Sequence, residues 1–251
     1  MNFQKKIWGR HPVCEAVRSG KRPIEIIFLS KDSKGDIVDE IKKLAKEKNI
    51  DLVYKDKGFF YNFGQSHQGV AALLGDAERQ VVTGVEDILD VSKKNEKPPF
   101  ILLLDSITDP HNLGAILRTA ESAGVDGVII PKHRACGLSG TVAKTSAGAV
   151  EHVLIAEVTN LSQEIERLKN ENIWVVGLDT SAQKSIYEMD LKIPLALVVG
   201  SEGEGLHKLI KEKCDFLANL PMNGKINSLN ASVAAGICLY EAVRQRRQRN
   251  N

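Results

Sequence analysis

Residues 100–124 read FILLLDSITDPHNLGAILRTAESAG, an apolar run followed by a turn and a helical pattern. Five apolar residues without a polar break are typical of a parallel strand that is buried on both faces. The Asp109-Pro110 pair predicts a turn, and residues 112–124 predict a helix behind it. The stretch therefore predicts one strand–helix unit of a parallel α/β sheet.

The same alternation continues toward the C-terminus. Further strands are expected at residues 127–131, 173–179 and 195–200, and helices at 159–170 and 230–248. Strands that alternate with helices indicate βαβ units, so we predict a parallel sheet.

The first part of the chain predicts a smaller α/β unit. Strands are expected at residues 24–29, 51–54 and 69–74, and an amphipathic helix at 36–48 with Asp36 as its N-cap. A polar stretch that ends in KKNEKPP then indicates a linker with a short helix at 85–91. With 251 residues and about 150 per domain, we predict domains at 1–76 and 98–251, joined by a linker at 77–97.

Composition excludes several classes of protein. The chain is 43% hydrophobic and 26% charged, which is typical of a globular protein and excludes a disordered or collagen-like one. No run approaches the ~18 apolar residues of a membrane helix, and no secretory signal is visible, so a cytoplasmic protein is expected. The four cysteines have no CxxC spacing, so buried free thiols are expected rather than a metal site.

Basic residues gather near the two ends of the chain, although the net charge is only +2. They are Lys5, Lys6, Arg10, Arg18, Lys21, Arg22, Arg244, Arg246, Arg247 and Arg249. Two such clusters suit a polyanion such as nucleic acid, because phosphate contacts give affinity that does not depend on sequence. Charged termini that serve only solubility are the alternative.

In an open α/β sheet, ligands bind beyond the carboxyl ends of the strands, where three segments of this chain should lie. In the first, Asn112 can cap a helix, Gly114 permits close approach of a ligand, and Arg118 has apolar neighbours. A functional Arg118 and a solvated salt bridge are both open interpretations.

The second segment is GSEGEGL, residues 200–206, with Glu202 at its apex. Its G-x-x-G-x-G spacing is not the dinucleotide fingerprint, and the chain holds no phosphate-binding P-loop motif. Glu202 can take part in chemistry or simply cap a turn. In the third segment, residues 220–230, Asn223-Gly224 predicts a turn and either Ser228 or Asn230 can cap the final helix.

The three segments together resemble the SpoU-type (TrmH-like) branch of the SPOUT RNA ribose methyltransferases. The matching motifs are N-x-G-x-x-x-R (Asn112, Gly114, Arg118), G-S-E-G-x-G (residues 200–205) and P-M…S-L-N-x-S-x-A (residues 221–234). IWGRHPVCEAV and SHQGVAA resemble the small L30e-like substrate-binding domain of such enzymes. The whole arrangement is most similar to bacterial enzymes that methylate a guanosine 2′-hydroxyl in large-subunit (23S-type) ribosomal RNA.

The resemblance implies an α/β fold: a parallel-sheet SPOUT catalytic domain with a C-terminal trefoil knot, which is an exception to ordinary topology. It also implies an obligate homodimer with the active site near the interface. S-adenosylmethionine (AdoMet) would be held, largely by main-chain groups, at Leu178, Thr180, Gly200, Leu220 and Leu229.

The implied catalytic residues are Arg118, Glu202, Asn112, Ser228 and Asn230. A guanidinium stays protonated in proteins, so we expect Arg118 to anchor a phosphate and stabilise the developing alkoxide. A phosphate oxygen or Glu202 would then accept the proton of the ribose hydroxyl. Asn112, Ser228 and Asn230 can orient the ribose and Arg118, and one or two of them can also be helix caps.

In the small domain, RNA contact is expected from Arg10 and His11 and from residues 67–69, His67, Gln68 and Gly69. Trp8 could stack on a base or belong to the core.

Three alternatives stay open: a non-catalytic RNA-binding protein, the same enzyme class acting on tRNA or on an antibiotic-resistance site of rRNA, and a nucleotide-dependent doubly wound enzyme. Intact Arg118, Glu202 and Asn230 argue against the first, and the missing glycine fingerprints against the last.

Overall fold

A computed structural model of the chain describes residues 6–21, 23–63, 66–75, 82–225 and 227–247. The chain divides into two compact units. Unit 1 comprises Met1–Val81 and Leu138–His152, and unit 2 comprises Val82–Gly137 and Val153–Asn251. A short segment from the middle of the sequence therefore belongs to the N-terminal unit.

Unit 2 contains the parallel sheet that the alternating pattern predicts. Its eight described strands follow the order β10-β12-β9-β11-β6-β7-β8-β5, and every neighbouring pair is parallel. The strands are β5 (Val82–Thr83), β6 (Phe100–Asp105), β7 (Gly127–Pro131), β8 (Ile155–Val158), β9 (Trp174–Leu178), β10 (Lys184–Ser185), β11 (Leu195–Gly200) and β12 (Phe216–Asn219). Strands β5, β8, β10 and β12 were not predicted, because each is short and carries little apolar pattern.

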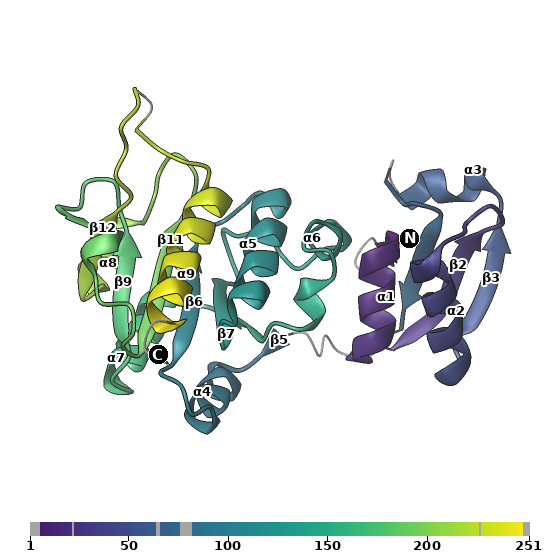
Figure 1. The fold of residues 1–251 in the computed structure, drawn as a ribbon, viewed down its shortest axis with the longest axis horizontal. Coiled ribbons are helices and arrows are strands. Elements are labelled where there is room, and N and C mark those ends of the chain that lie inside the picture. The colour runs from purple at the N-terminus through teal and green to yellow at the C-terminus, as the bar shows by residue number, and fades with distance from the viewer. Residues whose placement is uncertain (1–5, 22, 64–65, 76–81, 226, 248–251) are drawn as a thin grey trace. The chain divides into compact units, whose positions relative to one another are not determined.

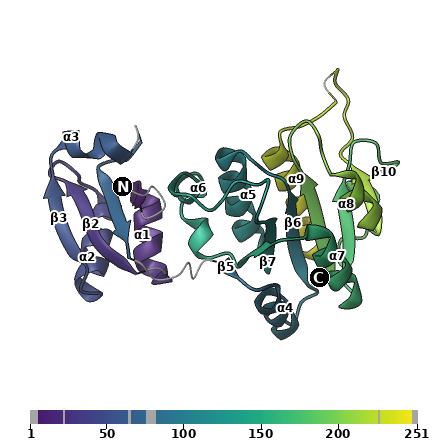
Figure 2. The same cartoon turned by 180° about the vertical axis from the view of Figure 1, so that it is seen from behind.

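Helices cover both faces of this sheet. They are α4 (Val85–Lys94), α5 (Pro110–Ala123), α7 (Leu161–Asn170), α8 (Lys208–Lys213) and α9 (Ala231–Arg247). Helices α5 and α9 lie on one face, while α7 and α8 lie on the other (Figure 1, Figure 2). All six residues of β6 and of β11 are buried, which confirms the prediction from their unbroken apolar runs.

The predicted linker differs from the structure over Val82–Lys94, which forms β5 and α4 of unit 2. Val85, Ile88 and Leu89 of α4 are buried in the core of that unit, so this amphipathic helix is part of its packing. Residues 77–81 of the predicted linker lie outside the described residues. The domain boundaries at 76 and 98 stay predictions.

Unit 1 has a four-stranded mixed sheet in the order β1-β4-β2-β3. Its strands are β1 (Lys6–Trp8), β2 (Ile24–Ser30), β3 (Asp51–Lys55) and β4 (Val70–Leu74), and its helices are α1 (Arg10–Ser19), α2 (Asp36–Glu47), α3 (Lys57–Phe60) and α6 (Gly140–Thr145). The prediction of Asp36 as an N-cap is wrong: Gly35 holds that position with φ +119°, and Asp36 is the first helical residue.

An aromatic cluster fills one side of unit 1, where Phe28, Phe60 and Phe63 are buried together. Trp8 packs against this cluster. A Cβ on Gly140 would lie 2.5 Å from the Trp8 ring, so α6 begins directly against the indole. Of the two interpretations of Trp8, the structure therefore supports the core one.

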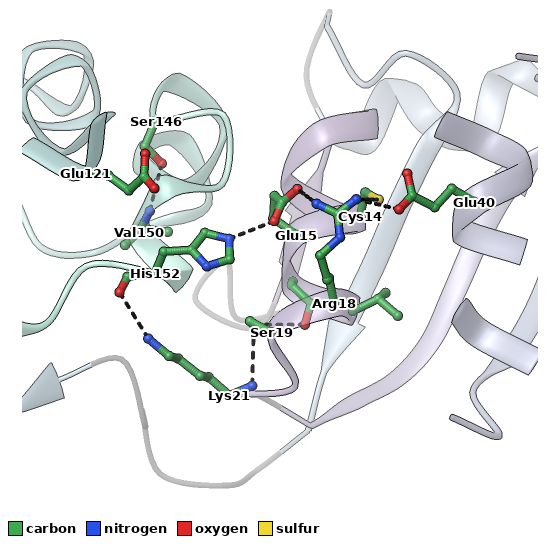
Figure 3. Close-up of polar contacts among 12 residues, drawn as sticks. Cys14, Glu15, Arg18, Ser19, Lys21, Glu40, Glu121, Ser146, Val150 and His152 are labelled. Atoms are coloured by element: carbon green, nitrogen blue, oxygen red, sulfur yellow. Dashed lines mark hydrogen bonds and ion pairs between the residues drawn. The ribbon is translucent and has the colours of Figure 1, made fainter. Parts of the chain in front are cut away.

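Three of the described residues in the N-terminal basic cluster make contacts within unit 1. Arg18 is paired with Glu15 and Glu40, and Lys21 donates to the carbonyl of His152 (Figure 3). Lys6 is buried, with its Nζ 5.2 Å from the centre of the Phe63 ring. Lys5 and Arg22 lie outside the described residues. Among the described residues, the charges of Lys6, Arg18 and Lys21 therefore serve intramolecular contacts.

At the other end of the chain, Arg246 is a structural residue. Its guanidinium donates to the carbonyls of Leu191, Pro98, Pro99 and Ile193 at 2.8–2.9 Å, and lies 4.5 Å from the Phe100 ring centre. Burial lowers the pKa of Arg246 to about 10. The inclusion of this residue in a polyanion-binding cluster is wrong, since four of its five N–H donors are bonded to carbonyls of the chain. Arg249 lies outside the described residues.

We expect Arg246→Met to lower the free energy of unfolding by about 3 kcal/mol, because four partly buried carbonyls lose a charged donor. Chemical denaturation of the full chain measures this change. Arg247→Met is the matched control, since Arg247 is exposed on the same helix, and it should shift stability by less than about 0.5 kcal/mol. Equal effects of the two substitutions would contradict the assignment.

Candidate functional site

Three loops meet at the carboxyl edge of the sheet in unit 2. They follow β9, β11 and β12, which are adjacent strands, and they lie at the same end of the sheet (Figure 1). Together they line a cavity of about 340 Å³. All five predicted cofactor-binding residues line it: Leu178, Thr180, Gly200, Leu220 and Leu229. The volume lies within the range of about 300–1,000 Å³ for small-molecule sites.

The loop after β11 folds back on its own start. Ser201 and Gly205 exchange backbone hydrogen bonds of 3.1 and 3.0 Å. As a result, a Cβ on Gly200 would lie 2.1 Å from the carbonyl carbon of Gly205, a distance that no side chain can occupy. Gly203 and Gly205 have φ of +90° and +68°, which also favours glycine. The glycines of the GSEGEG motif are therefore explained by the shape of one tight turn.

The loop after β9 is held by Asp179, which is buried. Its carboxylate accepts hydrogen bonds from the N–H and hydroxyl of Ser181 at 2.8 and 2.6 Å, and it is paired with Lys211 of α8. Burial by itself would raise the pKa of Asp179, but Lys211 and Ser181 outweigh burial and lower it. This ion pair fixes one wall of the cavity.

A hydrogen-bond network connects all three motif segments. Asn230 Oδ1 accepts from the N–H of Ser232 at 3.0 Å, so Asn230 is the N-cap of α9. This bond orients the Asn230 amide, whose Nδ2 donates to Asn112 Oδ1 at 2.9 Å and to Glu202 Oε2 at 3.0 Å. Asn112 Nδ2 in turn donates to the same Glu202 oxygen at 3.2 Å.

The network holds the Glu202 carboxylate by one oxygen only. Oε2 accepts from two amides, while Oε1 has no hydrogen bond to any of the described residues. Glu202 is exposed and lines the cavity. An oriented carboxylate with an open oxygen can accept a proton or a hydrogen bond from a ligand hydroxyl.

The expected cap function of Asn112 is wrong. Asp109 is the N-cap of α5, where its side chain accepts a hydrogen bond from the N–H of His111 at 2.9 Å. Because α5 begins at Pro110, Asn112 is the third residue of the helix. The Asp109-Pro110 pair supplies both cap and first turn, so the Asn112 amide is available to Glu202.

Two predicted catalytic residues are not part of this network. Arg118 is exposed on α5, and its guanidinium has no hydrogen bond or ion pair within the described part of the chain. It does not line the cavity. Ser228 is exposed at the cavity wall, beside Leu229.

An Asp105–His207 pair at the same edge was not predicted. Asp105 ends β6 and is buried, and it accepts from the His207 N–H at 2.7 Å and lies 3.0 Å from Nδ1. The pair ties the start of α8 to β6. The sequence feature that could have indicated this pair is the aspartate that ends the apolar run at residues 100–105.

Two features are absent from the described residues. Among the described residues, no three His, Cys, Asp or Glu side chains are grouped in a way that could hold a metal ion. Within the same residues, no helix combines the length and the apolar character needed to cross a membrane.

Comparison with known proteins agrees with the geometry. Residues 99–240 match the SpoU rRNA Methylase family, and residues 6–80 match the family of RNA 2′-O ribose methyltransferase substrate-binding domains. The chain belongs to the SpoU family and is an RNA methyltransferase of that class.

Its relatives match over nearly the whole chain. A Bacillus subtilis (strain 168) protein named for the TrmH family of tRNA/rRNA methyltransferases is 44% identical over 95% of this chain and 94% of its own. Among solved structures, an RNA 2′-O ribose methyltransferase has a TM-score of 0.77 at 26% identity, with 97% and 90% coverage. The SpoU methyltransferase AviRb of Streptomyces viridochromogenes has a TM-score of 0.80 at 24% identity, with 98% and 91% coverage.

Proposed function

We propose that this chain transfers a methyl group from AdoMet to a ribose 2′-oxygen of RNA, and that the target is a guanosine of large-subunit rRNA. The observation that carries the proposal is the position of Glu202. Its carboxylate lines the cavity and is also held by Asn112 and Asn230. The cavity and the polar network therefore form one site.

The cavity suits AdoMet. Leucines 178, 220 and 229 give it an apolar lining for a purine, and the glycines at 200, 203 and 205 line it with main-chain atoms. AviRb, whose fold this chain shares, has been solved in complex with AdoMet. When bound, AdoMet supplies an electrophilic methyl group.

Each proposed catalytic residue of this chain then has a separate role. Glu202 Oε1 accepts the proton of the ribose hydroxyl, which is too weak a nucleophile while protonated. Arg118 anchors the adjacent phosphate and stabilises the developing negative charge. Asn112 and Asn230 keep the carboxylate in position, and Ser228 contacts the ribose from the cavity wall.

The choice of rRNA rests on the N-terminal unit, which resembles the L30e-like substrate-binding domain of enzymes that methylate a guanosine of large-subunit rRNA. The curated relatives are named for both tRNA and rRNA, so tRNA is the alternative substrate. Either RNA would place the enzyme in the cytoplasm. The trefoil knot of the C-terminal segment belongs to the same proposal.

We also propose that the enzyme is a homodimer. On α9, Val233 and Tyr240 are 49% and 50% exposed, and they lie on one side of the helix because seven residues make about two turns. An apolar helix face open to water is typical of an interface. Arg118 lies on α5, which packs against α9, so a dimer built on α9 would have the helix that carries Arg118 next to its interface.

Val233→Glu should convert the protein to a monomer in sedimentation experiments, because it places a charge in an apolar contact. Leu209→Glu is the control, since Leu209 is 53% exposed on α8, and it should leave the assembly unchanged. A monomeric wild-type protein at micromolar concentration would contradict the proposal.

The function is tested by incubating the protein with labelled AdoMet and total RNA from cells that lack it, and mapping any 2′-O-methyl group. Label on one guanosine of large-subunit rRNA supports the whole proposal. Label on tRNA keeps the reaction and overturns the substrate. Absence of label on every RNA, including precursor particles, with AdoMet still bound would favour a non-catalytic RNA-binding protein.

A further inference from the structure

Unit 1 contains a polar groove that the catalytic site does not explain. It has a volume of about 610 Å³. The lining residues come from the start of α1, the end of β2 and the loop after it, residues 57–61, and the loop before β4; those that bear on a ligand are Arg10, Asp32, Lys57, Tyr61, His67 and Gln68. Four separate segments thus converge on one surface of the small domain.

An aromatic ladder forms one side of the groove. The buried Phe60 ring stacks on His67, with ring centres 5.3 Å apart and planes inclined by 26°. Tyr61 meets His67 edge-on at 6.2 Å and is 72% exposed. The core therefore supports His67 and His67 supports Tyr61, while the tyrosine ring stays open to a planar ligand.

The imidazole of His67 is fixed in one tautomer. Its Nδ1 accepts a hydrogen bond from the N–H of Gly69 at 2.9 Å, so Nδ1 carries no proton. Burial lowers the pKa of His67, which favours the neutral ring. The proton of that ring is then on Nε2, and His67 offers a single oriented donor.

Two cations in the groove have unused donors. Arg10 Nε donates to the carbonyl of Gln68 at 3.3 Å, which ties the side chain to the loop before β4. Neither the Arg10 Nη atoms nor Lys57 Nζ has a partner among the residues that the structure describes. Asp32 is the acidic group that lines the groove, and its carboxylate can accept hydrogen bonds from a ligand.

We propose that this groove binds one unpaired nucleotide of the substrate RNA, with the base stacked on Tyr61, the His67 Nε2–H donating to it, and the flanking phosphates held by Arg10 and Lys57. Base stacking on an exposed aromatic ring beside cations is how proteins hold single-stranded nucleic acid. The proposal rests on the proposed RNA methyltransferase activity and assigns the contacts of its substrate.

The test measures binding of the full chain to a fluorescein-labelled, unstructured 12-nucleotide RNA of mixed sequence. Tyr61→Leu should weaken binding by about tenfold or more, and Tyr61→Phe by less than about twofold, because only the former removes the ring. Tyr54→Leu is the matched control, since Tyr54 is 52% exposed on β3 outside the groove. Lys57→Gln should reduce the slope of log affinity against log salt by about 0.7, the value for one phosphate.

A 4-thiouridine-substituted version of the same RNA should crosslink within the peptide that contains Tyr61 and His67. Crosslinks confined to other peptides, tighter binding of a duplex of equal length, or wild-type affinity in Tyr61→Leu would each overturn the proposal. If the wild-type protein forms the crosslink but transfers no methyl group to any RNA, that result would contradict the proposed function and leave the RNA-binding proposal standing.

Discussion

Gly200→Ala is expected to abolish AdoMet binding, with an increase in Kd of at least about 100-fold. The new methyl group would lie 2.1 Å from the Gly205 carbonyl carbon and 2.5 Å from the Leu206 nitrogen. Both are backbone atoms, so no side-chain rotation relieves the overlap, and the turn must open. Since this turn forms part of the cavity, its displacement removes the wall that we assign to the cofactor.

Titration calorimetry measures the affinity for AdoMet. Thermal unfolding without ligand measures the loss of folding stability, which we expect to be about 1–3 kcal/mol because the substitution overpacks the turn. Gly137→Ala is the control, because a Cβ there meets open space and its φ is ordinary. If Gly200→Ala binds AdoMet with wild-type affinity, the cofactor does not occupy this cavity.

Arg118→Lys is expected to lower methyl transfer by about 100-fold or more while leaving both stability and AdoMet affinity unchanged. Lysine keeps the charge but lacks the planar fork that can grip a phosphate with two parallel hydrogen bonds. Loss of one oriented donor to a developing oxyanion reduces turnover by about 10²–10³-fold in other enzymes. The guanidinium has no partner within the described chain, so its replacement costs no intramolecular contact.

Single-turnover assays on the RNA identified by methylation mapping provide the measurement. Arg167→Lys is the control, because Arg167 on α7 is ion-paired with Glu86 on α4 and a lysine can keep that pair. Near-wild-type turnover of Arg118→Lys would show that charge alone is sufficient. A loss of AdoMet binding would instead assign Arg118 to the cofactor.

The parallel sheet of unit 2 could be predicted from the sequence because its central strands carry a strong local signal. The strands at 100–105 and 195–200 consist almost entirely of consecutive apolar residues. Such runs are typical of strands in a sheet that is buried on both faces. Short strands such as β10 and β12 carry no comparable pattern. They form because the edge of an existing sheet offers them hydrogen-bond partners, which is a tertiary effect.

The functions of individual polar residues were harder to predict. Asn112 fits a helix cap by local rules, but Asp109 occupies that position and leaves the Asn112 amide for Glu202. Arg246 fits a basic surface cluster, but it is buried against four carbonyls. In both cases the hydrogen-bond partner is distant in the sequence, so no local sequence pattern indicates the contact.

The sequence by itself determined the class of fold and the three motif segments, since apolar periodicity and glycine-rich turns are local properties. Only the tertiary structure decided which side chains of those segments meet. Residues 112, 202 and 230 are brought together by the parallel order of the strands, and Glu202 is held by one oxygen because two amides from different helices converge on it. Long-range convergence of this kind depends on packing, which sequence spacing does not encode.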